Sequence, residues 1–150
     1  GGQTSFLNEL LQFEEKVSIY NGVFYGATRL DQTTFDLVVV PAPGVSLEEA
    51  EAAMDMAVAA IMREGVDEAH LERIKMQLRA SQIYEQDNVA GIGCKYGRAL
   101  TSGLTVADVK AWPDILQSVT ADEIMDAARL VFAEETSVTG WLMRDTEVTQ

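Results

Sequence analysis

The sequence predicts an α+β fold in which helices pack on one face of a small, mainly antiparallel sheet. Two segments, residues 17–28 and 33–41, are rich in β-branched and aromatic residues. Because only a short turn joins them, they are expected to pair antiparallel. Downstream, Ser46, Thr105 and Thr120 are each followed three positions later by an acidic residue, the pattern of a capping box that starts a helix. Strands followed by a series of helices indicate the α+β class.

The amino-terminal part predicts a short helix and then a strand. Thr4 or Ser5 can cap a helix that ends near Glu15, because polar oxygens there accept from free backbone N–H groups. Its expected buried stripe consists of Phe6, Leu7, Leu10 and Leu11. Gly22 and Gly26 interrupt the strand that follows, which predicts a bend or a bulge in it.

Two long helices are expected in the middle of the chain, over residues 46–64 and from about residue 68 to 102. The apolar stripe of the first consists of Leu47, Ala50, Met54, Ala57, Val58, Ile61 and Met62. Gly65 is expected to end that helix in a left-handed conformation. Gly91 and Gly93 lie inside the second, where each costs roughly 1 kcal/mol relative to alanine, so a kink or a close helix contact is expected there.

The carboxyl-terminal part predicts two further helices and a closing strand. Pro113 is expected to break the helix that Thr105 starts or to begin a new first turn, because proline lacks an N–H group and clashes with the preceding turn. Thr120 starts the last helix, and residues 137–143 are expected to be a third strand. With no internal repeat or long linker, residues 1–150 are expected to form a single domain.

Bulk properties exclude several classes of function. Of the 150 residues 47% are hydrophobic, which is ordinary for a globular domain, and the net charge of −13 repels nucleic acid and anionic membranes. Cys94 is the single cysteine, so no intrachain disulfide can form and either redox compartment is possible. The chain starts with Gly1 and Gly2 instead of methionine, which indicates a processed product or an excised piece.

A pattern of prolines, glycines and acids runs from the end of the second strand into the second long helix. Its residues are Pro41, Gly44, Ser46, Glu48, Glu49, Gly65, Val66, Glu68, Leu71 and Lys75. The pattern resembles the pitrilysin- and insulinase-type zinc metallopeptidases, which include the mitochondrial processing peptidases. Residues 1–18, 118–132 and 137–143 resemble the same family. The resemblance implies a processing-peptidase-like half-domain, namely the later part of the carboxyl-terminal, non-catalytic domain.

The catalytic signature of that family, His-x-x-Glu-His, is absent from this chain. His70 is the only histidine and is expected on an exposed helix surface. On one continuous helix Cys94 would lie roughly 36 Å from it, too far to share a metal ion. No metal ligand and no catalytic residue is therefore expected here, and Cys94 is expected to be buried as a small apolar side chain. The resemblance implies that zinc is bound by the catalytic half of the parent enzyme.

The glycine pattern and the acidic pairs in the sequence are better explained by structural roles than by binding or catalysis. Gly91, Gly93 and Gly97 miss the spacing of a dinucleotide-binding loop, since Tyr96 holds the place of the last glycine, and helix packing is expected instead. Three acidic pairs could act as paired carboxylates: Glu14 with Glu15, Glu48 with Glu49, and Glu134 with Glu135. Neighbours in sequence point apart on a helix, so solvated faces are expected.

The resemblance also bears on substrate contacts. Many family members carry an arginine and, seven residues later, a tyrosine that reach the substrate from the non-catalytic domain. The matching positions here are Gln12 and Ile19, which lack the charge and the hydroxyl group. Tyr20, Tyr25 and Arg29 are the nearby alternatives.

The leading hypothesis is a non-catalytic half that closes over a catalytic peptidase domain, fused or separate, and walls a chamber that binds a peptide substrate. The first alternative is a non-proteolytic scaffold subunit of the same family, and the second is an unrelated acidic protein-binding module. A sheet that lacks a strand from upstream would expose an edge, so self-association or marginal stability is expected. Because bacterial relatives are often exported, the resemblance favours a periplasmic location.

Overall fold

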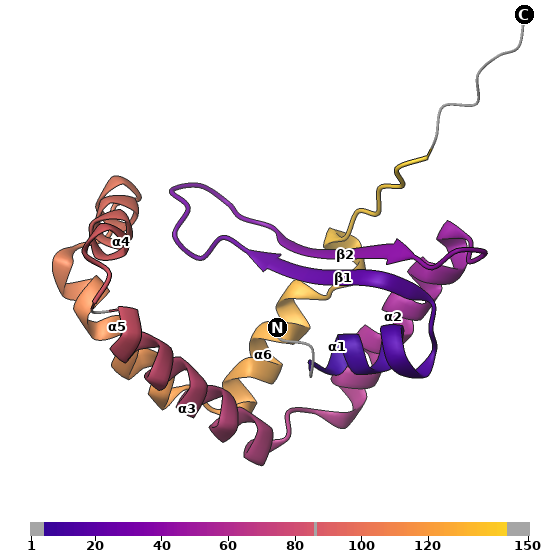
Figure 1. Cartoon of the computed structure of the whole chain (residues 1–150), viewed down its shortest axis with the longest axis horizontal. Helices are drawn as coiled ribbons and strands as arrows, with labels where there is room; N and C mark the ends of the chain where they lie inside the picture. The colour runs from indigo at the N-terminus through magenta and orange to yellow at the C-terminus, as the bar shows by residue number, and fades with distance from the viewer. Residues whose placement is uncertain (1–4, 86, 144–150) are drawn as a thin grey trace, which may run out of the picture.

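The fold is a β-hairpin packed on helices, with a helical arm beside it. The computed structural model describes residues 5–85 and 87–143; Gly1, Gly2 and Thr4 lie outside this part. Its elements are α1 (Phe6–Asn8), the π-helix η1 (Glu9–Glu14), β1 (Ser18–Tyr25), β2 (Phe35–Pro41), α2 (Leu47–Glu64), α3 (Glu68–Glu85), α4 (Val89–Thr101), α5 (Val106–Ser118), α6 (Ala121–Val131) and the 3-10 turn η2 (Glu134–Thr136). Figure 1 shows α1, α2 and α6 on one side of the hairpin, whereas α3, α4 and α5 form an arm that curves away. The predicted α+β class is confirmed.

No helix in the described residues is long and apolar enough to span a membrane.

The two strands pair antiparallel, as predicted, with a bulge near the start of β1. Tyr20 pairs with Val40 and Ser18 with Pro41, so Ile19 is the extra residue that interrupts the register. The expected bulge is therefore present, but it lies before Gly22. An extra residue bends its strand and shifts the in-and-out alternation by one position.

The core lies between η1, α2 and one face of the hairpin. Leu11 from η1 packs with Ala53, Met54 and Ala57 from α2. The partly buried residues around this cluster are Leu7, Leu10, Val17, Leu37 and Val39. Alanines on α2 let η1 approach closely. Ala53 was not in the predicted stripe, and the stripe residues nearest the end of α2 remain only half-buried.

The first helix differs from the prediction in form and in packing. Its second half is a π-helix, in which the N–H of Glu15 donates to the carbonyl of Leu10, 2.8 Å away. Ser5 makes no side-chain cap bond, and Phe6 is exposed instead of buried. Leu11 is nevertheless fully buried, as predicted.

The three predicted helix starts are confirmed. The side chains of Ser46, Thr105 and Thr120 each accept from the backbone N–H three residues on, and the acid there bonds back. Gly65 ends α2 with φ 79° and ψ −169°, so its φ is positive, as only glycine readily allows, but it is not in the left-handed helical region that we expected.

The single helix expected over residues 68–102 is two helices. Asn88 caps α4, because its Oδ1 accepts from the N–H of Gly91 at 2.9 Å. An N-cap residue has a non-helical backbone, here with φ −101° and ψ 85°, so no continuous helix runs through Asn88. A side chain added at Gly93 or Gly97 would meet nothing within 4 Å, so the close helix contact predicted at the glycines is wrong.

Pro113 does not break its helix, contrary to expectation. It lies inside a continuous α5 and has no N–H to donate to the carbonyl of Val109. Val109 is buried, and the Gln117 Nε2 donates to the carbonyl oxygen of Lys75 on α3 at 3.1 Å. Contacts on both sides of the proline therefore hold α5 together.

The closing strand predicted at residues 137–143 is wrong. This segment has no regular structure, and within the described residues the sheet contains β1 and β2 only. The indole N–H of Trp141 donates to Oε2 of Glu51 on α2 at 2.8 Å. This bond holds the segment at α2, off the sheet. The side chains of Val138 and Leu142 are 97% and 95% exposed.

Replacing Thr120 with alanine should lower the free energy of unfolding by about 1 kcal/mol at about pH 7, because α6 loses its cap. Hydrogen bonds from the backbone and then the side chain of Thr120 hold the pKa of Glu123 below its ordinary value of 4.5. A lowered pKa contributes stability that is present above the unfolded value and is lost as pH falls through the folded one. The difference between wild type and variant should therefore shrink in acid. Urea unfolding at about pH 7 and at a pH below the ordinary pKa of Glu123 checks this, with the exposed Thr28→Ala as control. A difference that is the same at both pH values would contradict the coupling between Thr120 and Glu123.

Candidate functional site

The side of the sheet away from the core carries an exposed apolar surface. Leu37 and Val39 point to the core cluster, so Val38 and Val40 of β2 lie on the opposite face. Their partners in the register are Gly22 and Tyr20, and Phe24 follows two residues on. We call Tyr20, Gly22, Phe24, Val38 and Val40 the open sheet face. Its four large side chains are exposed.

Gly22 brings the two rings of the open sheet face together. A Cβ at Gly22 would lie 2.7 Å from the Tyr20 hydroxyl oxygen and 3.1 Å from the ring of Phe24. Both side chains therefore lean over this glycine, since only a residue without a side chain leaves room. The result is an aromatic surface with one hydroxyl group, which suits the apolar side chains and the backbone of an extended peptide.

A carboxylate lies at one end of this surface. Asp36 pairs with Phe24 across the strands, and its Oδ2 accepts from Oγ1 of Thr34 at 3.1 Å. Within the described sheet each strand has one neighbour only, so each also has a free backbone edge. An apolar face next to a free edge can bind a peptide as an added strand.

The other candidates from the sequence are not brought to this face. Gln12 is half-buried on η1, and Ile19 is the exposed bulge residue. Tyr25 lies on the helix side, where its ring centroid is 6.1 Å from that of Phe35. Arg29 folds back on the hairpin loop, with Nε 2.7 Å from where a Cβ of Gly26 would be. The structure thus groups Tyr20 with Phe24, which sequence reasoning missed although the i, i+2, i+4 spacing of Tyr20, Gly22 and Phe24 signals a shared face.

His70 and Cys94 do not form a site in the described residues. The backbone N–H of His70 donates to Oδ1 of Asp67 at 2.6 Å, and its Nδ1 lies 2.8 Å from Nη2 of Arg73. His70 is half-buried, not exposed as expected. Cys94 is exposed on α4, not buried as expected, and Ala99 is the residue of that helix that is buried. The break between α3 and α4 removes the 36 Å argument, but no group of three His, Cys, Asp or Glu that could hold a metal ion occurs in the part that the structure describes.

Among the acidic pairs, one member has an evident structural role. Hydrogen bonds from the backbone and side chain of Ser46 lower the pKa of Glu49 below its ordinary value, while Glu48 is exposed beside it. Glu14 and Glu15 are exposed. The side chain of Glu134 lies outside the described part. Within the described residues, these acids do not come together as a carboxylate pair in one site.

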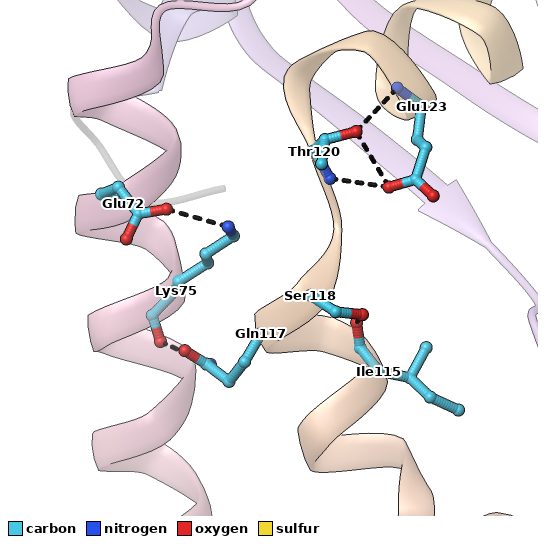
Figure 2. Close-up of polar contacts among 7 residues, drawn as sticks. All are labelled: Glu72, Lys75, Ile115, Gln117, Ser118, Thr120 and Glu123. Atoms are coloured by element: carbon cyan, nitrogen blue, oxygen red, sulfur yellow. Dashed lines mark hydrogen bonds and ion pairs between the residues drawn. The ribbon is translucent and has the colours of Figure 1, made fainter.

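A polar junction joins α3 to α5 inside the arm, next to the start of α6 (Figure 2). The side chain of Lys75 is only 13% exposed, and its Nζ lies 2.8 Å from Oε1 of Glu72, which is 64% exposed. The carbonyl oxygen of Lys75 accepts a hydrogen bond from the side chain of Gln117 on α5. The positive charge of the Lys75 ammonium group makes a small contribution to the lowered pKa of Glu123. Lys75 thus joins α3 to α5 beside the start of α6, which fixes these two helices of the arm to each other.

No protein-family model matches the chain, and no curated protein matches it. A solved structure does match: a protease from Helicobacter pylori superposes on 86% of this chain with a TM-score of 0.78. The chain shares its fold with part of a protease. At 12% sequence identity the likeness concerns the fold alone, and the chain spans about a third of that protease, 31% of its length.

Proposed function

We propose that this chain is the larger part of the non-catalytic half of a zinc metallopeptidase of the pitrilysin and insulinase type. In this role it closes over a catalytic half, fused or separate, that binds the zinc ion and supplies the general base. The observation that carries the proposal is the match of 86% of this chain to 31% of a protease. Proline, glycine and acid positions from Pro41 to Lys75 point to the same family.

The open sheet face is the surface that we assign to the peptide. It presents Tyr20 and Phe24 on a rigid, register-fixed hairpin whose other face is held by the core. An extended substrate would bury apolar side chains on these rings and form backbone hydrogen bonds at a free edge. Binding of this kind is tolerant of sequence, because backbone groups supply much of the affinity.

Replacing Tyr20 and Phe24 together with serine should weaken peptide binding roughly tenfold or more, because aromatic anchors dominate such contacts. Both side chains are exposed, so the fold should persist. Fluorescence anisotropy with labelled casein peptides measures binding, and circular dichroism checks folding. Leu130→Ser, an exposed site on α6, is the matched control. Equal binding by the double variant and the control would remove the open sheet face from the proposal.

The second candidate is a non-proteolytic scaffold subunit of the same family. The observation in its favour is that Gln12 and Ile19 stand where the resemblance implies arginine and tyrosine, and that neither lies on the open sheet face. A gene that encodes His-x-x-Glu-His in the same polypeptide, or next to this gene, favours the peptidase; its absence from both favours the scaffold.

A further inference from the structure

Residues 138–143, here called the tail segment, have the composition of a strand without being one. The segment contains Val138, Trp141 and Leu142 and no charged residue. Val138 and Leu142 are almost fully exposed, which is unusual for two large apolar side chains so close in sequence. Apolar, strand-forming residues left in water form a segment that gains stability by pairing with a sheet edge.

A matching edge lies on β2 of the same fold. Within the described sheet β1 is the one neighbour of β2, so the other side of β2 has free backbone N–H and carbonyl groups. The ring of Phe132, at the end of α6, lies 5.4 Å from that of Phe35 at the start of β2. Figure 1 shows the chain leaving α6 near β2 and then turning away from the sheet.

We propose that β2 of one copy takes the tail segment of a second copy as its next strand, and that the exchange is reciprocal. Trp141 bonded to Glu51 holds the tail segment away from its own sheet. Each copy offers one donor segment of six residues, 138–143, and one acceptor strand of seven, so two copies satisfy each other and the assembly closes with two-fold symmetry.

Charge supports this mode of contact over others. Two copies of net charge −13 repel each other, so a stable contact must lie where charge is low. The tail segment is uncharged, and so are residues 37–41 of β2. Association should therefore strengthen as salt screens the repulsion between the rest of the two surfaces.

Sedimentation velocity of the whole chain across a range of concentrations tests the proposal with two variants. The donor variant carries Val138→Asp and Leu142→Asp, and the acceptor variant carries Val38→Lys. Each alone should dimerise roughly tenfold or more weakly than wild type, since each exchange loses apolar burial. An equimolar mixture should form the heterodimer, because one of its two exchanges joins an intact tail segment to an intact β2, whereas neither variant alone can form an intact exchange. Leu130→Asp, with circular dichroism on all variants, is the control for added charge.

Three results would overturn the proposal. One is a wild-type chain that stays monomeric up to roughly 1 mM. Another is a dimer that the donor variant leaves unchanged, since a different surface then holds it. The third is a mixture of the two variants that associates no better than either alone. Monomers whose tail-segment amides are protected from hydrogen exchange would show that the segment closes on its own β2 instead.

Discussion

Replacing Leu11 with alanine should lower the free energy of unfolding by about 3 kcal/mol. Leu11 is 0% exposed and is the largest fully buried side chain in the described residues. Its neighbours Ala53 and Ala57 are too short to fill the space left, so a cavity should remain at the junction of η1 and α2. This is the largest single-residue effect that we expect, because few other large side chains are buried.

Urea unfolding monitored by circular dichroism measures the effect of Leu11→Ala. The matched control is Leu130→Ala, which removes the same atoms from a side chain that is 79% exposed and should change stability by less than about 0.5 kcal/mol. Equal effects of the two substitutions would contradict the packing of η1 on α2.

The isolated chain should hydrolyse no peptide and retain no zinc. A catalytic zinc site takes three protein ligands and a structural site four, whereas the sequence offers one histidine and one cysteine. Metal analysis after gel filtration and incubation with unfolded casein measure both properties. About one zinc per chain that is lost in His70→Ala, or chelator-sensitive cleavage that follows the protein through two columns, would place the active half within this chain.

Local signals in the sequence predicted local structure well. Capping boxes at Ser46, Thr105 and Thr120 form as expected, because each depends on residues within one helical turn. The break at Asn88 is local too, but it was missed. Ile83 and Ile92, which were assigned to one helix, are nine residues apart and would lie on opposite sides of it, so their spacing does not support a continuous helix.

Features that depend on distant contacts were not predictable. The tail segment has a strand pattern, yet the bond from Trp141 to Glu51, ninety residues away in sequence, keeps it off the sheet. The π-turn of η1 depends on how closely α2 allows η1 to approach, although the burial of Leu11 itself was predicted from the apolar stripe. Cys94 is exposed because of where α4 lies in the arm. The residues of α4 alone do not reveal that position.

The candidate site was predicted in part. Tyr20 was a candidate because it is next to Ile19 in the sequence. Which residues share the open sheet face with it depends on the bulge. Ser18 and Asn21 are both buried although they are three residues apart, because Ile19 is the extra residue between paired positions. Simple alternation from the start of the strand assigns the wrong face until this bulge is placed.

The central claim is that this chain completes a peptidase whose zinc lies elsewhere. The most direct measurement is a titration of the chain into the His-x-x-Glu-His half encoded with it, with hydrolysis of a quenched peptide followed throughout. We expect chelator-sensitive turnover that rises and saturates at one chain per catalytic half, with a weaker rise for the double variant at Tyr20 and Phe24. A catalytic half that is fully active alone and neither binds this chain nor gains activity from it would contradict the account.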